Sequence, residues 1–172
     1  SRVFSLMGDA AARRRGERAG RVLALGLSQT YLGASAIAAW ADKLRACERI
    51  VLTENPDVGD AGVERLIREG ALACVEDLWL GQCGLTDLSV ERLCEAAPPK
   101  LRGLWLPHNA LTPRSLDVLA RSSLLPQLTG LGLYGCGLER AGPLEGHPLE
   151  GAVTGTQRAP GVSALVFLGR HR

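Results

Sequence analysis

Aromatic side chains are scarce in this chain of 172 residues, and neither sign of charge dominates. Phe, Trp and Tyr together make up 4% of the sequence, and 20 Lys and Arg residues nearly balance 18 Asp and Glu residues, for a formal net charge of +2. Because no large charge excess is present, we do not expect nucleic acid as a partner. Hydrophobic residues at 46% and charged residues at 22% are typical of a globular protein and exclude wholesale disorder.

Paired cysteine motifs are also missing. The five cysteines are odd in number and include no C-x-x-C pair, which argues against a secreted disulfide framework and a structural zinc site. We therefore predict free thiols, no bound metal, and a cytoplasmic or otherwise intracellular location. The uncharged run from Val22 to Ala41 has the length of a membrane span, but the unpaired Gln29 near its middle is costly in lipid. We expect no membrane association.

Catalytic motifs are absent as well. The chain has no phosphate-binding loop, no H-E-x-x-H sequence and no nucleophile elbow. Gly130, Gly132 and Gly135 match the spacing of the dinucleotide fingerprint, but that fingerprint requires a helix to start at the third glycine, and none is predicted there. We expect no cofactor, no small-molecule substrate and no enzymatic activity.

The sequence does contain an internal repeat. Anchor residues recur at steps of 25, 28, 26 and 27 residues, and they are Leu25, Ile50, Leu78, Leu104 and Leu131. Apolar residues accompany each anchor three positions before and two positions after it. The fifth position after the anchor forms a polar or thiol column, which comprises Thr30, Asn55, Cys83, Asn109 and Cys136.

Each repeat predicts a short strand, a turn at the Asn/Cys column and an amphipathic helix. The helical part is indicated by apolar pairs at i and i+3, such as Val63 with Leu66 and Leu116 with Leu119. One unit cannot bury its own leucines, so the units must stack. The predicted fold is α/β, a curved solenoid with a parallel inner sheet and helices on the convex side. The Asn/Cys side chains are expected to turn inward and bond the turn backbone.

Two segments closely resemble the leucine-rich repeats of the ribonuclease-inhibitor class. They are LWLGQCGL from Leu78 to Leu85 and NPDVGDAGVERL from Asn55 to Leu66. The alternation of Asn and Cys in the turn column fits that class, which also occurs in the C-terminal regions of NLR innate-immune receptors. This resemblance implies a protein-binding role for the concave face.

Both ends of the chain depart from the repeat, so three regions are predicted. Residues 1–21 form either an N-terminal cap or a basic arm, residues 22–141 form about five leucine-rich repeats, and residues 142–172 form an irregular Gly/Pro-rich segment. Val162, Leu165 and Phe167 restore the strand columns and indicate a possible sixth, edge strand.

The residues that alternate with the buried columns should point to the concave face. Trp79 and Trp105 share one such column on neighbouring strands, about 4.8 Å apart, so their indoles should touch, and Tyr134 should reach the edge of Trp105. The glycines around Trp105 are expected to leave a recess for a partner residue, and they are Gly103, Gly130 and Gly132. A polar rim is predicted from Arg49, Glu54, Asp77 and His108. Trp40 occupies a helix core column and should be structural.

These features predict a non-enzymatic protein–protein interaction domain that binds its partner through the concave face. Two alternatives remain open at this stage. The chain could be the recognition region of a larger regulatory receptor or ubiquitin-ligase adaptor, or a GTPase-regulating repeat domain that supplies an arginine, with Arg49 and Arg114 as the candidates. The tryptophan pair could also serve only to shield the sheet.

Overall fold

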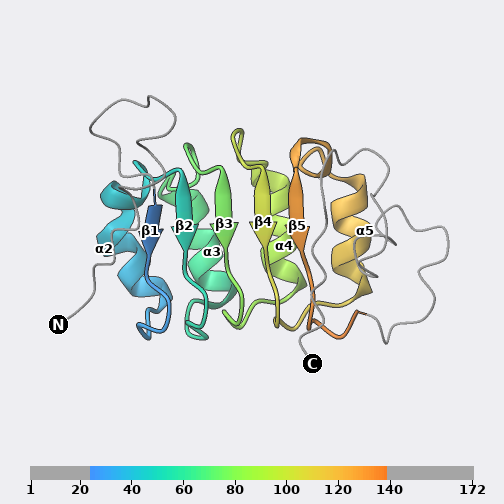
Figure 1. Cartoon of the computed structure of the whole chain (residues 1–172), viewed down its shortest axis with the longest axis horizontal. Helices are drawn as coiled ribbons and strands as arrows, with labels where there is room; N and C mark the ends of the chain where they lie inside the picture. Colours follow the sequence, from blue (N-terminus) through green and yellow to red (C-terminus); the bar gives the residue numbers. More distant parts are fainter. Residues whose placement is uncertain (1–23, 139–172) are drawn as a thin grey trace, which may run out of the picture.

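The computed structural model describes residues 24–138, which form an α/β arrangement of strands and helices in alternation (Figure 1). The strands are β1 (Ala24–Gly26), β2 (Arg49–Val51), β3 (Asp77–Trp79), β4 (Gly103–Trp105) and β5 (Gly130–Gly132). The helices are α2 (Ala34–Leu44), α3 (Gly59–Arg68), α4 (Asp87–Ala96) and α5 (Pro113–Arg121), and a short 3-10 helix, η1 (Leu125–Gln127), precedes β5. The predictions for residues 1–21 and 142–172 lie outside the described residues.

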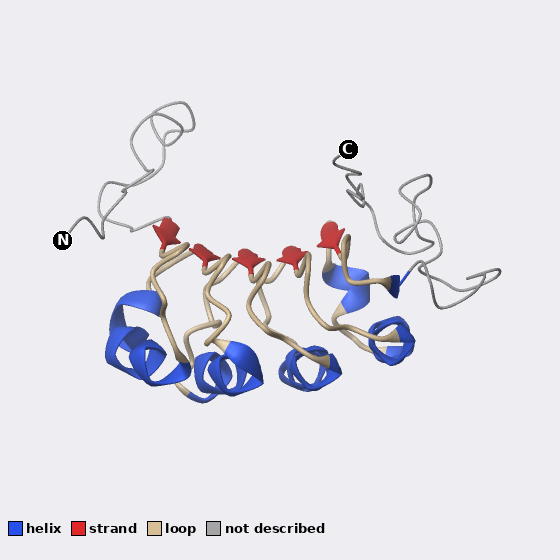
Figure 2. Ribbon diagram, turned by 90° about the horizontal axis from the view of Figure 1, so that it is seen from below, coloured by secondary structure: helices blue, strands red, loops and turns tan. Residues whose placement is uncertain are grey.

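The five strands form one parallel sheet in the order β1-β2-β3-β4-β5. Helices cover one face of this sheet, and the strands lie on the inner side of a shallow arc (Figure 2). We call the face of the sheet that no described helix covers the inner face. The predicted α/β class, with an all-parallel sheet and helices on one side, is confirmed.

The predicted anchor residues pair with one another across the sheet. Leu25 lies opposite Ile50, and the same register continues through Leu78, Leu104 and Leu131. The last four are fully buried, whereas Leu25 is only partly buried, because β1 has a described strand on one side only.

The helices contact the sheet through the predicted i, i+3 pairs. The pairs in α3, α4 and α5 are buried. In α2, however, the buried residues are Ile37, Ala41 and Leu44. The prediction that Trp40 is a core residue is therefore only partly right: it packs against the edge of the core, with the ammonium of Lys43 4.4 Å from its ring centroid.

Asn55 joins the first two repeat units through a buried side-chain amide. Its oxygen accepts hydrogen bonds from the backbone N–H groups of Thr30 and Leu32, both at 3.0 Å. Its nitrogen donates to the carbonyl oxygens of Leu27 at 2.7 Å and Leu52 at 2.8 Å. Three of these four partners belong to the preceding unit, so the amide satisfies turn backbone that no strand reaches.

Asn109 makes the equivalent contacts between the third and fourth units. Its oxygen accepts from the N–H groups of Cys83 at 3.0 Å and Leu85 at 3.1 Å. Its nitrogen donates to the carbonyl oxygens of Leu80 at 2.8 Å and Leu106 at 3.0 Å. The role predicted for this column is confirmed.

Cysteine takes the same position in the alternate units. The thiols of Cys83 and Cys136 donate to the carbonyl oxygens of Leu52 and Leu106, both at 3.2 Å. Burial raises the pKa of Cys83 to about 11, so its thiol stays protonated and can donate. All five cysteines are free, as predicted.

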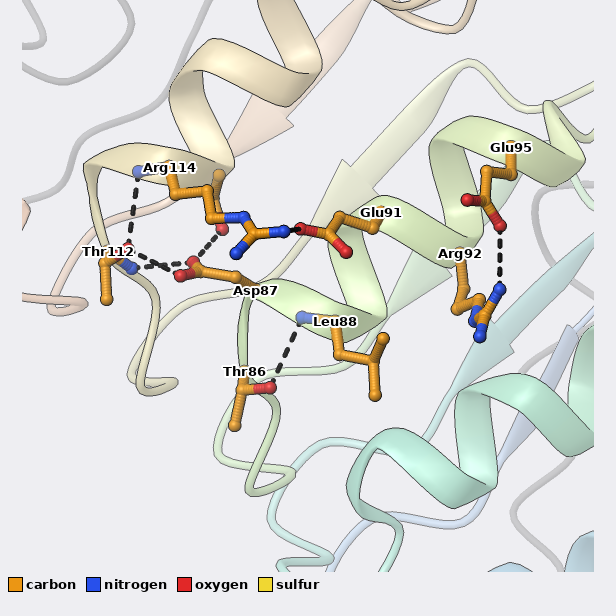
Figure 3. A network of polar contacts seen from close by, with 9 residues as sticks. Thr86, Asp87, Leu88, Glu91, Arg92, Glu95, Thr112 and Arg114 are labelled. Atoms are coloured by element: carbon orange, nitrogen blue, oxygen red, sulfur yellow. Dashed lines mark hydrogen bonds and ion pairs between the residues drawn. The ribbon is translucent and has the colours of Figure 1, made fainter.

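A second row of contacts links the starts of the helices (Figure 3). Asp87, the first residue of α4, accepts hydrogen bonds from the Thr112 N–H at 2.8 Å and the Thr112 hydroxyl at 2.5 Å, and also from the hydroxyl of Ser115. Thr112 in turn caps α5 by accepting from the N–H of Arg114. The cap of α5 is thus held by a carboxylate of the preceding unit.

Asp60 repeats this arrangement one unit earlier. It accepts from the N–H of Thr86 at 3.0 Å, from its hydroxyl at 2.7 Å, and from the hydroxyl of Ser89. Burial alone would raise the pKa of Asp60, but these hydrogen bonds outweigh it and hold the pKa below its ordinary value of 3.8. The pKa of Asp87 is likewise lowered: hydrogen bonds from Ser115 and Thr112 and the nearby charge of Arg114 outweigh burial. We call these contacts the aspartate row.

Replacing Asn109 should test the turn amide directly. We expect Asn109→Ala to reduce the free energy of unfolding by about 2–4 kcal/mol, because it leaves buried N–H and C=O groups without partners. Asn109→Cys should reduce the free energy of unfolding by less, since cysteine already occupies this position in the neighbouring units and its thiol retains one hydrogen-bond donor. Chemical denaturation of the three proteins gives the ranking, and equal losses in the two variants would contradict this account.

Because of the aspartate row, the free energy of unfolding should decrease as the pH falls into the acid range. A lowered carboxyl pKa in the folded state means that its stabilisation is present above the ordinary pKa of 3.8 and is lost as pH falls towards the lowered value. Asp87→Asn should therefore flatten the decline in unfolding free energy that the wild type shows as pH falls below about 4, measured by urea denaturation. Asp57→Asn, which removes an exposed carboxylate outside the row, serves as control, and identical profiles for the two variants would refute the assignment.

Candidate functional site

Two tryptophans lie side by side on the inner face. Trp79 ends β3 and Trp105 ends β4, and the two residues are partners in the parallel register. Their ring centroids are 4.9 Å apart with an interplanar angle of 24°, so the indoles stack. Both residues are half-buried. The contact predicted between them is confirmed.

The recess predicted around Trp105 does not exist, because the indole itself fills it. A Cβ atom on Gly132 would lie 2.6 Å from Cε3 of Trp105, and one on Gly130 would lie 2.9 Å from Cζ2. The ring therefore occupies the space directly above the backbone of Gly130 and Gly132 on β5. Glycine at these positions makes room for Trp105 and leaves none for a partner residue.

A third glycine accommodates polar atoms. A Cβ atom on Gly103 would lie 2.1 Å from Oδ1 of Asp77 and 3.0 Å from the indole nitrogen of Trp105. The other carboxylate oxygen of Asp77 accepts hydrogen bonds from Arg49, at 2.9 Å from Nη2 and 3.3 Å from Nε. The indole nitrogens of Trp79 and Trp105 are buried, and neither has a hydrogen-bond partner among the described residues. Arg49, Asp77 and the tryptophan pair thus form one continuous group across β2, β3 and β4.

Tyr134 contacts a different residue from the one predicted. Its ring meets the imidazole of His108 edge-on, with centroids 5.3 Å apart and an interplanar angle of 89°. His108 has a φ of 55°, and its imidazole lies over Gly135, where a Cβ atom would be 2.2 Å from Nδ1. The left-handed turn therefore directs His108 towards the next unit, where it meets Tyr134 and not the tryptophans.

His108 belongs to a row of left-handed residues that the sequence analysis missed. The residue four positions after each anchor has a positive φ in all five units, namely Gln29, Glu54, Gln82, His108 and Gly135. The glycine in the fifth unit, directly before the Asn/Cys column, was the available signal. Within this row the amide of Gln29 donates a hydrogen bond to the carboxylate of Glu54.

The seven predicted site residues therefore fall into two groups. Trp79, Trp105, Asp77 and Arg49 lie together on the inner face, whereas Glu54, His108 and Tyr134 lie at or beside the turns where the strands end. The remaining arginine candidate, Arg114, is on the helix side, 2.6 Å from Glu91 (Figure 3). Both candidate arginines thus form ion pairs, Arg49 with Asp77 and Arg114 with Glu91.

The part of the chain that the structure describes contains no group of three or more His, Cys, Asp and Glu side chains placed to hold a metal ion. No helix within residues 24–138 combines the length and apolar character needed to cross a membrane. No protein-family model matches the sequence, and no curated protein matches it significantly. What is established for the described residues is a repeating α/β arrangement with a stacked tryptophan pair on its inner face.

The fit between Trp105 and β5 can be tested with two equivalent glycines. We expect Gly132→Ala to displace the indole, weaken the exciton signal of the stacked pair in circular dichroism and lower the free energy of unfolding by about 1–3 kcal/mol. Gly26 occupies the same column in β1, and a Cβ atom there meets nothing within 4 Å, so Gly26→Ala should leave the signal unchanged. A similar spectrum for both variants would show that Trp105 does not rest on Gly132.

Proposed function

We propose that this chain is a leucine-rich-repeat arc of the ribonuclease-inhibitor-like class that binds a protein partner through its inner face without catalysing a reaction. Five successive strand units in one register, with buried Asn and Cys alternating in the turn column, support the repeat assignment. The five free thiols support an intracellular setting.

The observation that carries this proposal is the stacked pair of tryptophans on a sheet face that no described helix covers. Tryptophan is enriched among the few residues that dominate binding energy in protein interfaces. A stacked pair also presents a large apolar surface whose rotamers are already fixed, which reduces the ordering required on binding.

The two tryptophans have different parts in this proposal. Trp105 rests on the backbone of β5, which is the role that the shielding alternative gives to both rings. Trp79 lies on Trp105 and is the ring presented to a partner. Substitution of Trp79 therefore separates binding from folding better than substitution of Trp105.

Affinity capture with a matched tryptophan control tests the proposal. The wild-type chain, Trp79→Ala and Trp40→Ala are immobilised, and proteins retained from cell lysate are quantified by mass spectrometry. Trp40 is also half-buried but lies on α2, on the opposite side of the sheet. We expect at least one protein to be retained by the wild type and by Trp40→Ala but to bind Trp79→Ala at least about 30-fold more weakly, the consequence of losing about 2 kcal/mol.

Circular dichroism and the unfolding midpoint establish that both variants are folded. If every retained protein binds Trp79→Ala and Trp40→Ala equally, the inner face is not the binding surface and the proposal is wrong.

A further inference from the structure

The ring stack on the inner face has one covered end and one open end. Trp105 lies on the backbone of β5, and Trp79 lies on Trp105. Among the described residues, Trp79 has a ring contact with Trp105 only and no cation over its ring, so the other face of its indole carries no second ring or cation. The stack therefore ends at Trp79 on β3, and the register partner of Trp79 on β2 is Val51.

Beside this surface the inner face is built from small residues. Ala24, Gly26 and Val51 occupy it on β1 and β2, and all three are half-buried. A Cβ atom on Gly26 would meet nothing within 4 Å, whereas the equivalent Gly132 in β5 is covered by Trp105. Among the described residues the two ends of the inner face thus differ: an indole covers the β5 end, whereas small apolar residues form the surface over β1 and β2, on the other side of Trp79.

Charge is distributed just as unevenly. The strand segments and adjoining turns of β1, β2 and β3 (residues 24–29, 48–54 and 76–82) carry four acidic residues and one basic residue, a net charge of −3. The equivalent segments of β4 and β5 (residues 102–108 and 129–135) carry a net charge of +1. The charged residues of these segments are Arg49 and Asp77 in the strands and Glu48, Glu54 and Glu76 in the adjoining turns. Arg49 is paired with Asp77, so the net negative charge belongs to the half of the sheet that is built from β1, β2 and β3 and that includes Trp79.

We propose that the partner presents an arginine side chain to the outer face of Trp79. Its methylene stem lies on the floor of Ala24, Gly26 and Val51, and its guanidinium stacks on the indole within the acidic half of the sheet. A cation over a tryptophan face is the most favourable cation–π pairing, and the planar guanidinium of arginine both stacks on aromatic rings and pairs with carboxylates. This inference rests on the proposed function and specifies what the inner face recognises.

Three short peptides test the chemistry of the occupant. The probes are acetyl-Gly-Arg-Gly-Arg-Gly-amide, its lysine copy and its citrulline copy, which keeps the planar shape without the charge. The three tryptophan indole N–H signals, assigned by single substitutions, are followed by NMR during titration of the full chain. We expect the arginine peptide to shift the Trp79 signal and not that of Trp40, and to bind at least about fivefold more tightly than the citrulline copy, with lysine between them. Equal binding of the arginine and citrulline peptides would overturn the proposal.

Charge variants keep the test independent of any effect of Trp79 substitution on folding. The double variant Glu54→Gln, Glu76→Gln removes two exposed carboxylates. It should bind the arginine peptide about three- to tenfold more weakly than the wild type. Glu64→Gln, the same change on the exposed side of α3, should leave its affinity unchanged. An arginine-peptide affinity that the double variant does not alter would also overturn the proposal.

The arginine-rich start of the chain is the competing occupant. A variant that replaces Arg13, Arg14, Arg15 and Arg18 with glutamine should bind the arginine peptide as the wild type does. Binding more than about threefold tighter would show that this segment competes for the same surface, and the assignment to a partner would then be wrong. If capture of a protein depends on Trp79 while the peptides fail, the proposed function stands and only this inference falls. If capture does not depend on Trp79, the proposed function itself fails.

Discussion

The buried amides of Asn55 and Asn109 are the interaction on which the rest of this structure depends. Where a strand gives way to a helix, the turn leaves backbone N–H and C=O groups inside the protein with no strand partner, and unpaired groups of this kind are destabilising. Each amide satisfies four of them, mostly in the preceding unit. The units are thereby joined at a fixed offset, and that offset brings Trp79 and Trp105 into the same row of the sheet.

The aspartate row makes a second connection on the helix side. Asp60 and Asp87 hold the threonine cap of the following helix, so neighbouring units are joined both at the turn and at the helix start. In the fourth unit the equivalent position is Pro113, which supplies no carboxylate, and the row ends there. Two lines of contacts on different sides of the core restrict the movement of one unit against the next, which is the property a preorganised binding surface requires.

Small residues make the two ends of the inner face different from each other. Glycines on β5 admit the indole of Trp105, and Trp79 stacks on it, so the pair leans towards one end of the sheet. The opposite end has an equally small Gly26, and no ring of the described residues lies above it. A repeating backbone thus carries a surface that does not repeat, with an aromatic face and an excess of negative charge on the same half.

The sequence alone determined the strand register, the buried columns, the role of the Asn/Cys position and the contact between the two tryptophans, because these follow from the repeat length and from the alternation of side chains along a strand. The pairing of Tyr134 with His108, the filled space around Trp105 and the aspartate row were decided by the tertiary structure. Each of them depends on where a side chain turns beyond its Cβ atom, and that direction is set by neighbours from other units. The column of left-handed residues has a similar origin, since only Gly135 carries a local preference for positive φ, whereas Glu54 and His108 adopt it because the turn requires it.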